Sequence, residues 1–230
     1  MDYSIDLVPN DSYGNVYYNL EDDISNIYVE VEYIENTSNA YINTGIAGTG
    51  SQKIECVFLP VKKTTNEYNC VYGARTSPGK QDGIYIYSIN SSSNYGYVAY
   101  NTTTAANVLA ASIGVKHTLI QNKGSFTLDG TTIKNHTNAT FTASANIFIF
   151  DGSNGNTPGN YRGYIRIFSF KIYNGSGVLV RDFVPVIKLS TKKYGLYDKI
   201  NRVFYVSPNG TEFIGSTSVN LDSSNKPIIY

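Results

Sequence analysis

Three glutamates near the start of the sequence are the first residues whose spacing suggests catalysis. Glu30, Glu32 and Glu35 lie in the segment YVEVEYIE. Hydrolysis of a glycosidic bond needs two carboxyl groups that face each other across a cleft, about 5 to 10 Å apart. Glu30 and Glu32 share one face of the expected strand, but charged side chains normally stay in water. A solvated strand face is the favoured interpretation, and we expect no enzymatic activity.

Histidines and cysteines offer no better arrangement for chemistry. The sequence lacks the G-x-S-x-G elbow of serine hydrolases. His117 lies in an expected strand and His136 in a polar turn, and no sequence feature selects a nucleophile for either. Cys56 and Cys70 could pair across neighbouring strands, although two buried thiols are the favoured interpretation. Neither histidine stands at zinc-ligand spacing from these thiols.

The polar stretch DGSNGNTPGN suggests a metal ion in place of catalysis. Asp151, Asn154 and Asn156 supply oxygen atoms at spacings that suit a calcium site. The stretch has one carboxylate only, and Asp and Asn also suit turns because they bond to their own backbone. Calcium is therefore the ion that this sequence fits best, but a turn without a ligand is the favoured interpretation.

A concentration of tyrosines suggests a surface for binding sugars. The sequence has 21 Tyr and no Trp, and Tyr85, Tyr87, Tyr95 and Tyr97 fall on two successive expected strands. Each pair shares a strand face because strand positions alternate with a period of two. An exposed ladder would form a stacking platform; the alternatives are cross-strand packing and a subunit interface. Arg75 and Arg162, with Asp151, are candidates for the rim of such a site.

The patterns of charged and apolar residues argue against nucleic acid and membranes as partners. The chain has 18 basic and 18 acidic residues, with no basic stripe of the kind that nucleic acid binding requires. No stretch approaches the roughly 18 apolar residues that would cross a membrane. The opening residues Met1-Asp2-Tyr3 lack the features of a signal peptide. We expect neither nucleic acid nor a membrane as a partner.

The sequence pattern predicts that most of these candidate residues lie on strands or in the turns between them. Alternating apolar segments bounded by turn residues predict strands over 28–34, 51–61, 68–73, 83–89, 95–100, 115–122, 146–150, 164–173, 178–184, 203–206 and 212–214. Asp129-Gly130 predicts a tight hairpin turn. Helical periodicity is nearly absent, and only 195–201 suits one short helical turn. This pattern predicts an all-β, two-sheet antiparallel β-sandwich or jelly roll.

One long segment predicts a central strand. Over 164–173, strict alternation places Ile165, Ile167, Ser169 and Lys171 on one face, and Arg166, Phe168, Phe170 and Ile172 on the other. Neither face is purely polar, so we expect both sides to be largely covered.

The composition changes at both ends and suggests three parts. Residues 1–27 form an N-terminal arm that could anchor the protein or contact another subunit. Residues 28–215 form the sandwich. Residues 216–230 form a C-terminal tail whose apolar end, KPIIY, is typical of a docking segment.

Six stretches of the sandwich resemble a known family. They are YIENTSNAYINTGI, VYGARTS, FTLDGT, IFIFDGSNG, GYIRIFSFKIYNGSGVLVRDFVPV and YGLYDKINRVFY, in order between Tyr33 and Gly215. Together they resemble the concanavalin A-like, laminin-G-like jelly rolls of virion structural proteins from phages and prophages of gut bacteria. Glucanases of this fold carry E-x-D-x-x-E or E-x-D-x-E on one strand, and the sequence has neither motif.

This resemblance implies a lectin-like domain on a phage particle. The expected protein is a fibre, tail or capsid-decoration component, localised to the virion surface, whose partners are other virion proteins and a host cell-surface glycan. Such fibres are commonly homo-oligomers, often trimers, and laminin-G-like domains often hold calcium at one rim. The alternatives are a purely structural assembly protein and, less favoured, a polysaccharide-degrading enzyme.

Overall fold

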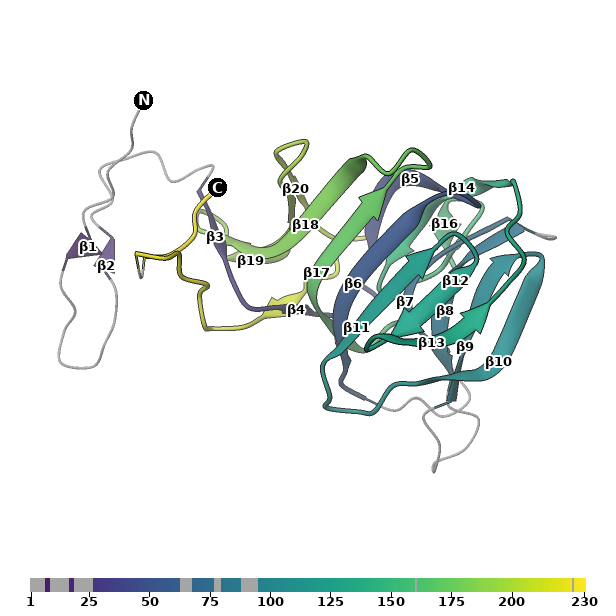
Figure 1. The fold of residues 1–230 in the computed structure, drawn as a ribbon. Coiled ribbons are helices and arrows are strands. Elements are labelled where there is room, and N and C mark those ends of the chain that lie inside the picture. The colour runs from purple at the N-terminus through teal and green to yellow at the C-terminus, as the bar shows by residue number, and fades with distance from the viewer. Residues whose placement is uncertain are drawn as a thin grey trace.

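Alternating apolar residues form strands through the whole described chain. The computed structural model describes residues 7–8, 17–18, 27–62, 68–76, 80–87, 95–159, 161–224 and 226–230 (Figure 1). Every regular element within these ranges is a strand, and neighbouring strands of the sheets pair antiparallel. Among the described residues, no helix has the length and apolar character needed to cross a membrane. The predicted all-β antiparallel sandwich is therefore confirmed.

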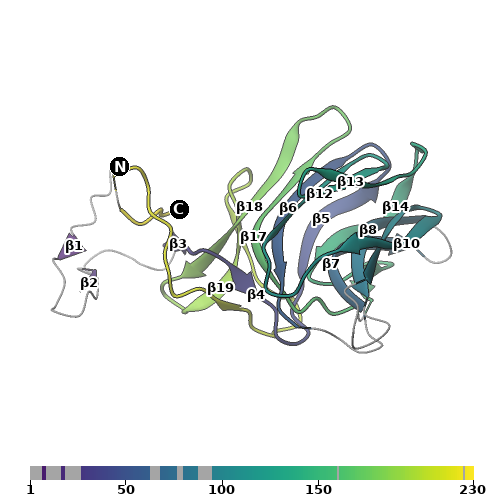
Figure 2. The ribbon, with the colours of Figure 1, turned by 60° about the horizontal axis from the view of Figure 1, so that its bottom comes forward.

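The smaller sheet has six strands in the order β10-β9-β8-β7-β14-β5. Their bounds are β5 Ile42–Thr49, β7 Tyr68–Thr76, β8 Lys80–Tyr87, β9 Tyr95–Asn101, β10 Thr103–Ala110 and β14 Thr142–Ile149. Figure 2 shows this layer facing the larger sheet.

The larger sheet follows the order β13-β12-β11-β6-β17-β18-β19-β20, with three short strands attached at its side. The bounds of the main strands are β6 Lys53–Pro60, β11 His117–Asn122, β12 Ser125–Leu128, β13 Thr131–Asn135, β17 Ile165–Tyr173, β18 Leu179–Lys188, β19 Lys193–Asp198 and β20 Val203–Tyr205. The attached strands are β3 Tyr28–Glu30, β4 Ile34–Glu35 and β21 Ile214–Gly215, and two separate hairpins are β1 Leu7–Val8 with β2 Tyr17–Tyr18 and β15 Ser153–Asn154 with β16 Thr157–Pro158.

The core lies between the two sheets. In β6, alternate residues Ile54, Cys56 and Phe58 are buried, as the period of two requires. The Phe170 ring of β17 meets the Tyr72 ring of β7 edge to face, with centroids 5.4 Å apart. Burying one such phenylalanine contributes about 2 to 3 kcal/mol. The thiol of Cys56 lies in this core.

The strand predicted over 164–173 is central, but its faces differ from the predicted ones. β17 lies between β6 and β18, and its register with β6 shifts between Ile167 and Ser169. This bulge inserts one residue, so Ile165 and Ile167 share the buried face with Phe170 and Ile172. The opposite face is half-buried throughout. Strict alternation was therefore the wrong assumption for this strand.

Two local predictions have opposite outcomes. Asp129 and Gly130 have φ values of 50° and 79°, the positive angles that a tight hairpin turn requires, and they join β12 to β13. The short helical turn predicted over 195–201 is wrong. Most of this segment belongs to β19, whose residues 195–198 are buried and pair with β18 and β20.

The end of the chain packs against β3. Val29 of β3 bridges to Ile229, and the Tyr230 hydroxyl donates a hydrogen bond to Glu30. The Tyr230 ring also stacks on Tyr197, with centroids 5.0 Å apart. Figure 1 shows β3 and the C-terminus together, at the end of the molecule away from β9 and β10.

Candidate functional site

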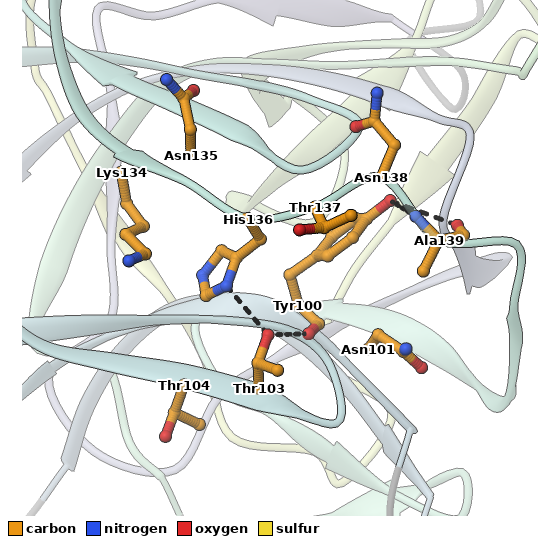
Figure 3. Close-up of a pocket in the computed structure, with 10 residues that line it drawn as sticks. All are labelled: Tyr100, Asn101, Thr103, Thr104, Lys134, Asn135, His136, Thr137, Asn138 and Ala139. Carbon is orange, nitrogen blue, oxygen red and sulfur yellow. Dashed lines mark hydrogen bonds between the residues drawn. The ribbon is translucent and has the colours of Figure 1, made fainter.

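A polar pocket lies where the edges of the two sheets come together. β10 ends the order of the smaller sheet and β13 ends that of the larger one. The pocket has a volume of about 440 Å³ and is named here the edge pocket (Figure 3). Its lining residues are Tyr100, Asn101, Thr103, Thr104, Lys134, Asn135, His136, Thr137, Asn138 and Ala139. The β9–β10 turn forms one side, and the end of β13 with the following connection forms the other.

Tyr100 ties the wall of the pocket to the body of the fold. Its side chain is fully buried, and its hydroxyl donates to the Gly50 carbonyl oxygen at 2.7 Å. The same hydroxyl accepts a hydrogen bond from the Ala139 backbone N–H at 3.2 Å. One side chain thus fixes the connection after β13 to the turn after β5.

The hydrogen bonds of His136 define which ring nitrogen carries the proton. The Thr103 hydroxyl donates its single hydrogen to the Tyr100 carbonyl oxygen at 2.9 Å. Thr103 Oγ1 must therefore accept from His136 Nδ1, which lies 2.8 Å away. This assignment follows from the network and leaves Nε2 of the neutral ring as an acceptor. Nε2 is buried without a hydrogen-bond partner in the described part of the chain.

The surroundings of His136 keep its ring neutral. The ring stacks on Tyr100 and meets Phe126 edge to face, at centroid distances of 5.9 and 6.0 Å. Burial lowers the pKa of His136 below its usual value of 6.5, and the nearby Lys134 ammonium lowers it further. His136 therefore acts at neutral pH as an uncharged part of the pocket wall.

The remaining lining residues can form hydrogen bonds, but none of them carries a carboxyl group. Thr104, Asn135 and Thr137 are exposed, and their hydroxyl and amide groups can both donate and accept. No aspartate or glutamate lines the pocket, so it lacks the paired carboxylates of glycoside hydrolysis. Lys134 is its one charged side chain when His136 is neutral. Such a lining suits a polyhydroxylated ligand.

The three glutamates of the first strand region have separate partners. Glu30 accepts hydrogen bonds from Asn220 and Tyr230, and Glu32 lies 3.3 Å from the Lys116 ammonium. Glu35 is buried and pairs with Arg166 Nε at 2.7 Å. The Glu35 pair is buried on the glutamate side, whereas the Glu32 pair is exposed and contributes little to stability.

His117 has a structural role in the larger sheet. Its Nε2 accepts the backbone N–H of Ser112 at 3.0 Å, so Nδ1 carries the proton and donates to Asp129 at 2.7 Å. Asp129 also accepts the Thr118 backbone N–H at 2.8 Å. Because both ring nitrogens are engaged, this histidine fixes the β12–β13 turn. Cys56 and Cys70 are both buried thiols, in agreement with the favoured interpretation.

The structure confirms that the strands of the predicted tyrosine platform are neighbours. β8 pairs with β9, and Tyr85 lies opposite Tyr97 in the register. The side chains of Tyr85, Tyr87, Tyr95 and Tyr97 lie outside the described part of the structure. The platform therefore stays a prediction.

Two of the three predicted rim residues contact Tyr161, and the third follows it in the chain. Arg75 Nη1 donates to the Tyr161 hydroxyl at 2.8 Å, and buried Asp151 accepts the Tyr161 backbone N–H at 2.8 Å. Both residues therefore contact Tyr161, next to which Arg162 is half-buried.

The predicted calcium ligands lie on two different segments of the fold. Asp151 Oδ1 also accepts the Gly152 N–H at 2.7 Å. Asn154 and Asn156 are exposed on the β15–β16 hairpin, where Asn156 Oδ1 accepts the Asn146 N–H. Among the described residues, no group of three or more His, Cys, Asp or Glu side chains could hold a metal ion.

Sequence reasoning missed the edge pocket because its sides are distant in the chain. Residues 100–104 and 134–139 meet only when the two sheets stack. The available signal was the polar run NHTNAT, from Asn135 to Thr140, directly after a hairpin.

Comparisons with known proteins support the fold. No protein-family model matches the chain, and no curated protein matches it. Among solved structures, the chain is similar to a protein from Bacteroides ovatus ATCC 8483 described, provisionally, as a "carbohydrate binding protein". The TM-score is 0.55 at 11% sequence identity, with 83% of this chain and 62% of the other chain covered. The likeness shows a shared β-sandwich fold, and this chain spans less than two thirds of that protein.

Proposed function

We propose that this chain is a carbohydrate-binding protein without enzymatic activity and that the edge pocket holds the sugar. The observation that carries the proposal is the lining of exposed hydroxyl and amide groups with no carboxylate. These groups match the alternating donors and acceptors of sugar hydroxyls. The Bacteroides ovatus protein with a similar fold is provisionally described as a carbohydrate-binding protein, which supports the carbohydrate-binding part of the proposal.

Each pocket on its own binds weakly. Tyr100 is fully buried, so its ring face gives no stacking surface and the affinity depends on hydrogen bonds. Each hydrogen bond contributes only about 0.5 to 1.5 kcal/mol after the exchange with water. Several pockets in one assembly would raise the overall avidity, since linked sites bind intramolecularly. A homo-oligomer, such as the trimer typical of phage fibres, would supply this multivalency.

The biological setting that we propose is a phage particle. The family resemblance of the sequence supports this setting, in which the domain would belong to a fibre, a tail or a decorated capsid. Its partners would be other virion proteins, and its ligand would be a host surface glycan. Two further features belong to this proposal. Tyr95 and Tyr97 would form a second contact surface for a long glycan, and calcium would bind at the Asp151 rim.

Binding to polysaccharide extracted from the host surface tests this proposal. The edge pocket is blocked by Thr137→Trp, which adds a large ring at an exposed lining position, and Thr132→Trp on β13 is the matched control outside the pocket. We expect the first variant to lose binding and the second to keep it. Loss of binding in Tyr95→Ala/Tyr97→Ala would locate the site on the platform, and sensitivity to EDTA would add the calcium ion. A folded protein that binds no glycan would favour the purely structural role.

A further inference from the structure

Lys134 gives the edge pocket a positive charge that no lining residue balances. No aspartate or glutamate contributes to the lining, and the half-buried His136 ring, whose pKa is lowered, is neutral. None of the ion pairs between described residues includes Lys134. The pocket therefore carries one formal positive charge among neutral hydroxyl and amide groups.

We infer that the edge pocket selects an anionic saccharide, a sugar whose ring hydroxyls meet the Asn and Thr side chains and whose acidic substituent meets the Lys134 ammonium. This inference rests on the proposed function, because it names the class of sugar that the same pocket takes. Carboxylate, sulfate and phosphate substituents share the chemistry that an ammonium group recognises.

The position of Lys134 suits this role. It lies two residues before His136 on the same wall, and Figure 3 shows its side chain beside the His136 ring. Its ammonium is close enough to lower the pKa of His136, after the larger effect of burial. The opposite side, formed by the β9–β10 turn, carries the neutral Asn101 amide and the Thr103 and Thr104 hydroxyl groups. A sugar between the two sides would have hydroxyl partners on one and an ammonium on the other.

The expected contribution of the charge is modest. Lys134 is half-buried at an open pocket, and pairs in contact with solvent contribute little and are screened by salt. We therefore expect an acidic sugar to bind about two- to fivefold more tightly than a neutral sugar with the same hydroxyl pattern. Hydrogen bonds to the amide and hydroxyl groups would supply the remaining affinity for both.

Trigalacturonate and its methyl ester form a matched pair of probes, because the ester keeps every ring hydroxyl and removes the charge. Galactose 6-sulfate separates sulfate from carboxylate recognition. Binding of each probe to the full chain would be measured by calorimetry for the wild type, Lys134→Gln, Thr137→Trp and Lys226→Gln. Lys226 is an exposed lysine outside the pocket, so Lys226→Gln removes the same charge elsewhere.

The inference predicts that the wild type and Lys226→Gln prefer an anionic probe, that Lys134→Gln loses this preference, and that added salt weakens it. Equal binding of trigalacturonate and its ester, unchanged by Lys134→Gln but lost in Thr137→Trp, would overturn the inference and leave the proposed function standing. No binding of any probe by the folded wild type, or binding that Thr137→Trp leaves intact, would count against both.

Discussion

Replacing Tyr100 by phenylalanine tests whether one buried hydroxyl holds the wall of the edge pocket. The substitution keeps the ring and removes the oxygen that bonds to the Gly50 carbonyl at 2.7 Å and the Ala139 N–H at 3.2 Å. Both backbone groups lose this partner beside a fully buried side chain. Leaving a buried polar group unsatisfied costs about 1 to 3 kcal/mol, so we expect Tyr100→Phe to lower the free energy of unfolding by that amount. A loss of about 2 kcal/mol lowers the Tm by about 4 to 8 °C in a protein of this size.

Urea unfolding of Tyr100→Phe would measure this loss as a shift in the midpoint at an unchanged slope. Tyr205→Phe is the matched control, because the described structure gives the Tyr205 hydroxyl no hydrogen bond while its ring packs on Phe183 at 5.2 Å. The control should lose less than about 0.5 kcal/mol. Sugar binding should also weaken in Tyr100→Phe, since the wall after β13 loses its attachment. Equal stability of the two variants would refute this account of the pocket wall.

Three further predictions concern pH, the core and the C-terminus. The pKa of His136 in the folded state lies below its unfolded value of 6.5, so the unfolded chain takes up the proton first as the pH falls. The free energy of unfolding should therefore decrease as the pH drops below about 6.5. Urea unfolding at pH 5 and 8 should show that His136→Asn removes this part of the pH dependence. Phe170→Ala should lower the free energy of unfolding by about 3 to 5 kcal/mol, because Phe170 is fully buried. Phe168→Ala should lower it much less, because Phe168 is half-exposed on the other face of β17. Similar losses for the two variants in thermal unfolding would contradict the bulge in β17. Tyr230→Ala removes the ring stack on Tyr197 and the hydrogen bond to Glu30. It should lower the free energy of unfolding, measured by calorimetry, by about 1 to 3 kcal/mol. An unchanged Tm would show that the C-terminal contact adds nothing to stability.

The sequence predicted those elements whose local chemistry agrees with their place in the sheets. Asp129-Gly130 forms the expected turn because few residue pairs adopt two successive positive φ angles. β10 gave no strand signal, because three of its eight residues, Thr103–Ala110, are alanines, which are depleted in strands. Pairing with β9 makes it a strand. Burial between β18 and β20 likewise overrides the weak helical signal in residues 195–198.

The bulge in β17 shows what periodicity cannot reveal. A period of two predicts faces correctly only while the pairing register is constant. One extra residue between Ile167 and Ser169 moves Phe170 onto the core face, and this shift depends on the pairing with β6. Nothing in the local sequence marks the position of such an insertion.

The candidate site was harder to predict than the fold. Reasoning on residue types selected the tyrosines of β8 and β9 and the oxygen atoms near Asp151. His136 was noted as a lone histidine in a polar turn. Its environment depends on Thr103 and Tyr100, which lie more than thirty residues earlier in the chain. Contacts between sheet edges require the three-dimensional fold, so the pocket could not be derived from spacing.

Mapping of amide chemical shifts would show whether a sugar binds in the edge pocket. Oligosaccharides cut from the host surface polysaccharide would be titrated into the ¹⁵N-labelled full chain. If the edge pocket holds the sugar, we expect saturable shifts in residues 101–104 and 134–138, and their loss in Thr137→Trp but not in Thr132→Trp. Shifts confined to other parts of the chain, or saturable binding that leaves these two segments unchanged, would contradict the edge pocket as the carbohydrate site.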